Sequence, residues 1–307
     1  MFDRTNFSRR EAIKGASAIM ADTMIDASNA AAFGKPNNYQ ADTGWDISSC
    51  NLCGKTAVVT GAAKGIGRSI CIALARRGAN IFGIDLMESV STNKSYPSSS
   101  EEDMKETEKA ITALGVKFNY AKADIRNYDE MQSLAKRIIT EMGTVDILVA
   151  DAGIEIIKPF TETDEQYWTD TMGVNVLGTA YTMRAFVPYM VKQNHGRIIA
   201  ISSTQGSHGV KHSAAYSGCK WAIVGLVKST ALELGANNIT VNAVVPELIA
   251  EPEAASVKTT MQTSYQHTWP GPDEVSPAIV FLASDAAKRI SGAVYDITGN
   301  RSKQYSS

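Results

Sequence analysis

Short apolar segments alternate with helical patterns along most of this chain, and a polar residue or a proline follows each apolar segment. Strands that alternate with helices form a parallel sheet with right-handed crossovers. The pattern therefore predicts an α/β fold, with one doubly wound sheet of seven strands in the order 3-2-1-4-5-6-7. Ligands of such sheets bind at the carboxyl ends of the strands, which the sequence places at Thr60, Asp85, Asp124, Asp151, Ser203 and Pro246.

A glycine-rich loop follows the first predicted strand. Residues 55–60 are rich in β-branched side chains, and a loop with three spaced glycines then leads into a helical pattern. Glycines let the backbone approach a pyrophosphate, whose charge is met by N–H groups at the start of the helix. This arrangement predicts a Rossmann-type dinucleotide site that includes Gly61, Lys64, Gly65, Ile66 and Gly67.

The next predicted strand indicates which dinucleotide binds. It spans residues 80–84 and ends in Asp85, followed by Leu86. A carboxylate about twenty residues after the loop can bind the adenosine ribose diol, and it repels a 2′-phosphate. Lys64 argues for NADP, because a basic side chain in the loop could pair with that phosphate. We give more weight to Asp85 and Leu86 and expect both to contact NAD.

A second group of residues predicts chemistry on a substrate oxygen. The apolar segment 198–201 leads to Ser203, and a helical pattern begins at Ser213. Tyr216 and Lys220 are four residues apart and share one face of that helix. A nearby cation favours phenolate and lowers the pKa of a tyrosine, which suits proton transfer. The alternative is a surface tyrosine and lysine on an ordinary amphipathic helix.

Together these motifs resemble the short-chain dehydrogenases/reductases, over about residues 52–299. The resemblance implies an NAD-dependent oxidoreductase that interconverts a secondary alcohol and a ketone by hydride transfer. It implies that Ser203 holds the substrate oxygen, that Tyr216 exchanges the proton, and that Lys220 lowers the pKa of Tyr216 and binds the nicotinamide ribose. Asn175 would hold a proton-relay water. Cofactor contacts are implied for Tyr216 and Lys220 and for Asp124, Ile125, Asp151, Ala152, Gly153, Pro246 and Ile249.

Several residues depart from the family pattern. Asp151 stands where asparagine is usual, and Glu247 and Glu251 follow the sixth predicted strand, where an acidic side chain would repel a pyrophosphate. We expect both glutamates to turn outward or to meet a cation, or this loop to bind the cofactor differently. The departures keep open a nucleotide-binding scaffold without turnover.

The segment from Met87 to Glu102 is longer than the usual connection between a strand and a helix. It resembles an insertion of carveol dehydrogenase-like members, a subgroup associated with tightly held NAD. The resemblance implies that the segment folds over the adenosine half of the cofactor; a solvated excursion is the alternative. Tightly held NAD would make the protein a nicotinoprotein, reset by a second substrate or an external electron carrier.

Residues 1–50 lack this periodicity, so we divide the chain into an N-terminal extension and a dehydrogenase domain over residues 51–307. Arg9 and Arg10, followed by Lys14 and an alanine-rich segment, resemble a twin-arginine export signal. We therefore expect a periplasmic or exported protein. A disordered basic N-terminus on a cytoplasmic protein is the alternative.

Composition limits the partners and sites. Of the 307 residues, 20% are charged, the formal net charge is -2, and no apolar run has the length of a membrane span. We therefore expect no nucleic acid partner and no membrane span. Cys50 and Cys53 form C-x-x-C without the further ligands that zinc needs, so we expect two thiols in a turn and no metal. A local disulfide or redox pair is the alternative.

The remaining predictions concern substrate and assembly. The helical patterns from Asp164 to Val191 and after Ser213 resemble faces through which the family forms dimers and tetramers, so we expect a homo-oligomer. Packing within one subunit explains much of the same pattern. Residues 254–272 would form a substrate lid that includes Tyr265. A small cyclic or terpenoid-like alcohol or ketone would suit the apolar side chains of Ile156, Trp168, Val210 and Trp269.

Overall fold

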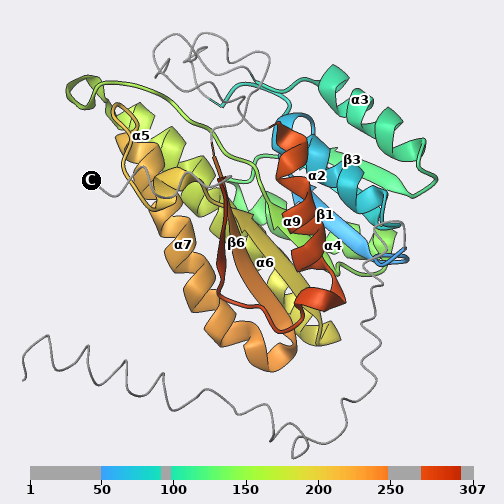
Figure 1. Cartoon of the computed structure of the whole chain (residues 1–307). Coiled ribbons are helices and arrows are strands. Elements are labelled where there is room, and N and C mark those ends of the chain that lie inside the picture. The colour runs from blue at the N-terminus through green and yellow to red at the C-terminus, as the bar shows by residue number, and fades with distance from the viewer. Residues whose placement is uncertain (1–49, 91–97, 248–270, 299–307) are drawn as a thin grey trace, which may run out of the picture. The chain divides into compact units, whose positions relative to one another are not determined.

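A computed structural model describes residues 50–90, 98–247 and 271–298 (Figure 1). Seven parallel strands form one sheet in the order β3-β2-β1-β4-β5-β6-β7, which confirms the predicted fold class and strand order. The strands are β1 Thr56–Thr60, β2 Asn80–Asp85, β3 Phe118–Lys122, β4 Ile147–Ala150, β5 Gly196–Ile201, β6 Ile239–Pro246 and β7 Val294–Ile297.

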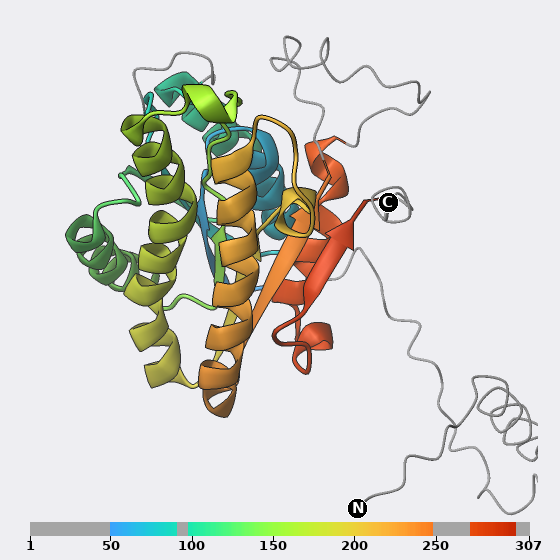
Figure 2. The same cartoon turned by 90° about the vertical axis from the view of Figure 1, so that its left-hand side faces the viewer.

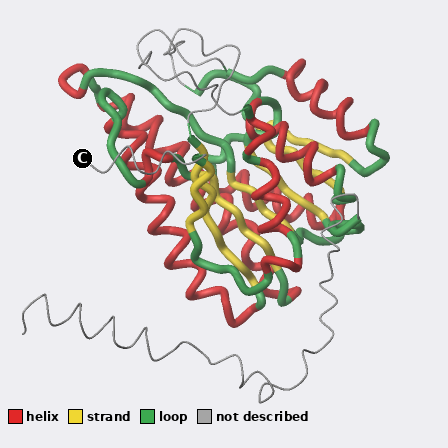
Figure 3. Tube along the Cα trace, viewed as in Figure 1, coloured by secondary structure: helices red, strands yellow, loops and turns green. Residues whose placement is uncertain are grey.

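Helices cover both faces of the sheet, as Figure 3 shows, and α6 and α7 lie side by side on one face (Figure 2). The helices are α2 Gly65–Ala75, α3 Glu101–Thr112, α4 Tyr128–Met142, α5 Glu165–Met172, α6 Thr179–Gln193, α7 Ala214–Leu234 and α9 Ser276–Ala283. On β1, Val58 packs in the core cluster with α4, α6 and α7, whereas Val59 packs in the cluster with α2, α3 and α9. Successive strand residues point to opposite faces, so a sheet covered on both faces needs continuous apolar strands.

The predicted helix from Asp164 to Val191 is confirmed as a continuous helical segment, but it contains a π turn that the sequence did not predict. The segment consists of α5, a π-helical turn η3 over Gly173–Gly178, and α6. Within the turn, the side-chain Nδ2 of Asn175 donates to the Thr171 carbonyl at 2.8 Å. Six residues are too few for a periodic apolar pattern to distinguish a π turn from an α-helix. π turns of this kind are frequent at functional sites.

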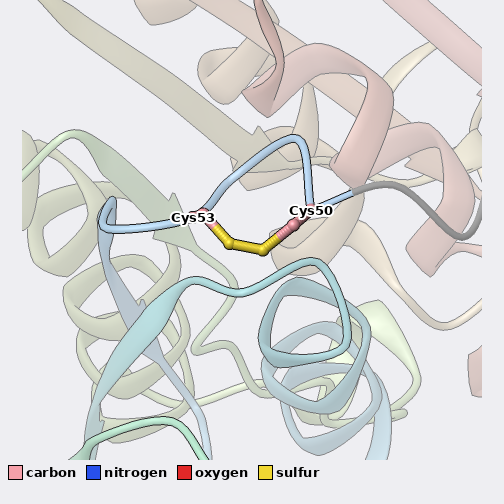
Figure 4. Close-up of a disulfide and its surroundings, with 2 residues drawn as sticks. All are labelled: Cys50 and Cys53. Carbon is pink, nitrogen blue, oxygen red and sulfur yellow. A yellow bond between two sulfur atoms is a disulfide. The ribbon is translucent and has the colours of Figure 1, made fainter.

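Figure 4 shows that a disulfide joins Cys50 and Cys53 at the start of the described fold, so the expected pair of separate thiols is wrong. The Cys53 N–H donates to the Cys50 carbonyl at 3.3 Å, and this turn sets the two Cα atoms 5.3 Å apart, within the usual range for a disulfide. Both sulfur atoms pack against Gly78. A Cβ on Gly78 would lie 2.5 Å from the Cys50 sulfur and 2.6 Å from the Cys53 sulfur.

No helix in the described part of the chain combines the length and apolar character needed to cross a bilayer. Within the same residues, no three side chains of His, Cys, Asp or Glu gather as ligands for a metal ion. The predicted export signal and most of the predicted lid lie outside the described residues, as do Ile249, Glu251, Tyr265 and Trp269.

Candidate active site

The glycine-rich loop joins β1 to α2 at the carboxyl edge of the sheet. Gly61 and Gly65 have φ angles of +74° and +57°, which residues with side chains rarely adopt. A Cβ on Gly67 would lie 1.9 Å from the Gly61 carbonyl oxygen, so only glycine fits there. α2 begins without a side-chain cap and without an acidic residue in its first turn. Its first N–H groups therefore suit an anionic pyrophosphate, and the residues present fit a dinucleotide.

Asp85 is buried at the end of β2, and its carboxylate accepts three hydrogen bonds. Oδ2 accepts the N–H of Ala63 at 3.0 Å, and Oδ1 accepts the N–H of Met87 at 3.0 Å and the hydroxyl of Ser99 at 2.5 Å. Leu86 is half-buried beside it. These bonds hold a negative charge next to the glycine loop, where a 2′-phosphate would be repelled.

The basic side chains of the loop and of α2 contact α3 or the segment before it. Lys64 Nζ donates to the Ser98 carbonyl at 3.4 Å. Arg68 donates to the Asp103 carbonyl at 2.7 Å and pairs with Glu106 at 2.9 Å. Because both cations bind groups on α3 or just before it, Lys64 is a weaker indication of a 2′-phosphate, and hence of NADP, than its position in the sequence suggests. Ile66, in the first turn of α2, is partly buried.

The insertion after β2 is attached to the sheet near both of its ends. Glu88 pairs with Lys122 of β3 at 2.6 Å, and Ser99 donates to Asp85 at 2.5 Å. Both contacts lie at the carboxyl ends of β2 and β3, on the side of the predicted adenosine site. Residues 91–97 are outside the described chain, so the predicted cover over the adenosine remains a prediction.

Asp124, predicted to contact the adenine, is held by Arg126, which the sequence did not single out. Arg126 donates to Asp124 Oδ2 from Nη2 at 2.6 Å and from Nε at 2.9 Å, and Nη1 pairs with Asp170 of α5 at 3.2 Å. Burial would raise the pKa of Asp124, but the hydrogen bonds and charge of Arg126 outweigh burial and lower it. Ile125 is buried, and its side chain packs against Gly178. Its contact with the cofactor remains a prediction.

Asp151, Ala152 and Gly153 follow β4 and are attached to β1 through the backbone. Thr60 Oγ1 accepts the N–H groups of Asp151 and Ala152, each at 3.2 Å. The Asp151 carboxylate leans over the glycine loop, since its Oδ2 would lie 2.9 Å from a Cβ on Gly67. Thr60 thus braces this segment although an aspartate stands where asparagine is usual.

Lys220 is buried, and its ammonium lies near Tyr216. Nζ donates to the Ile201 carbonyl at 2.8 Å and lies 5.2 Å from the centroid of the Tyr216 ring. Burial lowers the pKa of Lys220, and nearby negative charges that include Asp151 and Glu155 act in the opposite direction. The phenol and the ammonium are therefore close enough to act on one site.

Asn175 is buried in the π turn next to the segment after β4. Its Nδ2 donates to the Ile154 carbonyl at 2.8 Å, and its Oδ1 accepts the Ile154 N–H at 3.3 Å. A Cβ on Gly153 would lie 2.7 Å from Asn175 Oδ1 and 3.6 Å from Lys220 Nζ. Glycine at position 153 therefore lets both side chains approach the same point of the backbone.

Ser203 follows β5 and caps the short 3-10 helix η4, Thr204–Gly206. Its Oγ accepts the N–H of Gln205 at 3.3 Å, and the residue is partly exposed. Ser202 is buried, and its hydroxyl donates to the Lys220 carbonyl at 2.9 Å. Ser202 thus joins β5 to α7, whereas Ser203 is the more exposed serine of the pair and remains the candidate for contact with a substrate.

Sequence reasoning missed a hydrogen-bonded group around Glu155. Its Oε1 accepts hydrogen bonds from Gln205 Nε2 and Ser213 Oγ, both at 2.7 Å. Ser217 Oγ donates in turn to Gln205 Oε1 at 2.8 Å. The available signal was an acidic residue just after a predicted strand end, close to Gly153.

The walls of the site differ from expectation at Glu247 and at Ile156. Glu247 does not turn outward: it is 7% exposed, and its N–H donates to the Ile297 carbonyl at 3.3 Å, which continues the pairing of β6 with β7. The other two possibilities for this loop, that the glutamates meet a cation or that the loop binds the cofactor differently, remain predictions. Ile156 is not available to a substrate, because it is buried in the core cluster of α4, α6 and α7. Pro246, the last residue of β6, is also buried.

The strand order, the glycine loop and the Tyr216–Lys220 pair agree with what a comparison with protein families finds. A family model described as short chain dehydrogenase matches residues 55–262, which is more than half of the chain. The chain belongs to the short-chain dehydrogenases. The predicted family is thereby confirmed.

Several relatives of this dehydrogenase are known. An uncharacterized NAD-dependent oxidoreductase of Mycobacterium tuberculosis is 35% identical over 257 residues, 79% of this chain and 94% of that protein. A 3-oxoacyl-(acyl-carrier-protein) reductase of Staphylococcus aureus is 35% identical over 250 residues, 80% of this chain and 97% of that reductase. The crystal structure of carveol dehydrogenase from Mycobacterium avium in complex with NAD has a TM-score of 0.74 at 28% identity, and the match covers 80% of this chain and 96% of that one. The two mycobacterial proteins bear out NAD as the predicted cofactor.

Proposed function

We propose that this short-chain dehydrogenase interconverts a secondary alcohol and a ketone with NAD. The observation that carries the proposal is the buried Lys220 ammonium 5.2 Å from the Tyr216 ring, at the sheet edge that also holds the glycine loop. A cation beside a phenol lowers its pKa and makes proton exchange accessible near neutral pH. NAD, when bound, supplies the redox chemistry by accepting or donating a hydride.

The chain's own residues have separate tasks in this proposal. Ser203 holds the substrate oxygen by a hydrogen bond and keeps it beside Tyr216. Tyr216 takes the hydroxyl proton during alcohol oxidation and returns it during ketone reduction, while Lys220 stabilises the phenolate. Asn175, which lies in the π turn, holds a water molecule that relays the proton. The cofactor would be held by the α2 N–H groups at its pyrophosphate, by Asp85 at its ribose, and by Asp124 and Ile125 at its adenine.

A second candidate function is that of a nicotinoprotein, in which NAD stays bound between turnovers. The pairing of Glu88 with Lys122 favours it, because this contact attaches the insertion to the end of β3, next to Asp85, where the insertion would slow the release of a cofactor that binds the Asp85 carboxylate. A second substrate or an external electron carrier would then reoxidise the bound NADH.

One experiment tests these proposals. The protein is purified without added cofactor and denatured, and any released nucleotide is identified. Native protein is then assayed with a panel of secondary alcohols, with NAD and separately with an artificial electron acceptor. Turnover with free NAD supports the exchanging enzyme, whereas released NAD with acceptor-dependent turnover supports the nicotinoprotein. Nucleotide binding without turnover under either condition would contradict both and leave the scaffold.

A homo-oligomer remains part of the proposal. Apolar side chains on α5, the π turn and α7 are exposed in the single chain, among them Met172, Leu177, Trp221 and Leu232. Exposed apolar patches mark association surfaces. Light scattering of wild type and of a Trp221→Glu variant tests this, since a charge in a buried interface should shift the protein towards monomer.

Export by the twin-arginine route also remains a proposal. The Cys50–Cys53 disulfide supports it, because disulfides persist in oxidising compartments outside the cytoplasm. Cell fractionation, with the mass of the mature N-terminus, provides the test. Full-length protein confined to the cytoplasm would contradict export.

A further inference from the structure

Glu155 lies among segments that deliver the proposed catalytic groups. Its Oε1 accepts hydrogen bonds from Gln205 Nε2 and Ser213 Oγ, each at 2.7 Å. Gln205 lies on η4, just after Ser203, and Ser213 immediately precedes the helix that carries Tyr216. The Glu155 carboxylate therefore connects the segment after β4 to both of these catalytic segments.

The donors to Glu155 are themselves held in place. Gln205 and Ser213 are buried, and Gln205 Oε1 accepts the Ser217 hydroxyl at 2.8 Å. If the Gln205 amide turned over, its Oε1 would face the Glu155 carboxylate, and the hydrogen bond to Glu155 would be lost. The Glu155 carboxylate thus has a defined orientation before any substrate binds, which is what a selective binding group requires.

Glu155 retains hydrogen-bonding capacity. A carboxylate offers about four acceptor positions, and Oε1 uses two of them for Gln205 and Ser213. Oε2 accepts no hydrogen bond from residues 50–90, 98–247 or 271–298, and the Glu155 residue is partly exposed. A donor on a bound molecule can therefore reach it.

The charge of Glu155 also acts on the catalytic centre. Burial lowers the pKa of Lys220, and Glu155 is one of the charges that oppose this effect. Such an influence on a buried ammonium requires proximity, because charge interactions weaken with distance. For the same reason, an anionic group of a substrate would be repelled from this part of the site.

We infer that Glu155 is a specificity-determining residue that accepts a hydrogen bond from a second substrate hydroxyl, next to the hydroxyl that reacts. The inference rests on the proposed alcohol and ketone chemistry. It predicts that the site prefers vicinal diols and other polyols as substrates and that it disfavours hydroxy acids. It also departs from the terpenoid-like substrate expected from apolar side chains, one of which, Ile156, is buried in the core.

The test uses substrates that share one reacting carbon: cyclohexanol, the cis and trans isomers of 1,2-cyclohexanediol, and 2-hydroxycyclohexanecarboxylate. Wild type should show a kcat/KM for the better diol about tenfold or more above that for cyclohexanol, the size expected for a hydrogen bond to a charged group. In Glu155→Ala this ratio should fall to about one, with a smaller fall in Glu155→Gln, which keeps a neutral acceptor. Activity on the hydroxy acid, relative to cyclohexanol, should rise in both variants.

Glu162→Gln is the matched control. Glu162 is exposed on the short helix η2, Phe160–Glu162, in the same connection between β4 and α5, so this change removes an equal charge away from Gln205 and Ser213. Its diol preference should equal that of wild type. A preference that fell equally in the control would show a general charge effect and overturn the inference.

A binding measurement separates this inference from the proposed reaction. The rise in Tm caused by diol and by cyclohexanol is compared for NAD-loaded wild type and NAD-loaded Glu155→Ala. Selective stabilisation by diol that Glu155→Ala loses supports the inference even if neither alcohol is oxidised, a result that would contradict only the reaction. No selectivity in wild type, or a selectivity that survives in Glu155→Ala, overturns it. An equal fall in kcat for every substrate with an unchanged ratio also overturns it, and indicates that Glu155 only orders the catalytic segments.

Discussion

The Nζ atom of Lys220 lies 5.2 Å from the centroid of the Tyr216 ring, one turn further along α7. The same atom donates to the Ile201 carbonyl at the end of β5, at 2.8 Å. Since the ammonium is buried and bound to the sheet, the pair has a defined position relative to the strand ends. Tyr216 and Lys220, which are close together in the sequence, thereby belong to a site that also contains the segments after β4 and β5.

Replacing Tyr216 with phenylalanine should lower turnover about 100-fold or more, because the ring remains while the proton-transferring hydroxyl is lost. Affinity for NADH, measured by its fluorescence, should change little. Tyr181→Phe on α6 is the control, since that ring packs 5.3 Å from Tyr128 and should be dispensable for turnover. Full activity in Tyr216→Phe would remove the acid/base role.

Replacing Ser99 with alanine should tighten NAD binding, by up to about tenfold. Three of the roughly four acceptor positions of Asp85 are already used, and a ribose diol brings two donors, so Ser99 must give up its bond when the diol binds. Ser98→Ala is the control, because the backbone carbonyl of Ser98 receives the bond from Lys64. Titration of each variant with NADH measures the effect. Weaker binding in Ser99→Ala would show that Ser99 assists the cofactor instead.

Replacing Gly78 with alanine should destabilise the fold more than replacing Gly115. The two glycines have φ angles of +87° and +78°, so both substitutions carry a backbone cost of roughly 1–2 kcal/mol. A Cβ at Gly115 meets nothing within 4 Å, whereas one at Gly78 collides with the Cys50–Cys53 disulfide, which adds about 1–3 kcal/mol. Urea unfolding of both variants measures the loss in free energy of unfolding. Equal losses would show that the disulfide does not pack against Gly78.

Acid should reduce the stabilisation that Asp124 contributes. Its pKa is lowered in the fold from an ordinary value of 3.8, so the stabilisation is complete above that value and is lost as the pH falls through the folded-state pKa. Wild type should therefore exceed Asp124→Asn in stability by the largest margin above about pH 4, and the margin should shrink in more acid solution. Urea unfolding at several pH values measures it, with Glu233→Gln, an exposed change on α7, as control. A margin that grows on acidification would contradict the Arg126 pairing.

The sequence by itself determined the sheet, the glycine loop and the family. The strand order follows because alternating strands and helices allow few chain paths, given right-handed crossovers. The backbone of one short segment requires glycine at positions 61, 65 and 67. A requirement within so few residues can be recognised from the spacing of the glycines in the sequence. Tyr216 and Lys220 are likewise near each other on any helix that contains them.

Only the tertiary structure decided which distant side chains meet. Glu155 and Gln205 are 50 positions apart in the chain, and Arg126 and Asp170 are 44 apart, so neither contact leaves a periodic signal. The burial of Glu247 depends on the pairing of β6 with β7, which local sequence does not encode. Short-range patterns report backbone preference and burial within one element. A hydrogen bond between elements depends on how the whole sheet brings their ends together, and that is settled by long-range packing.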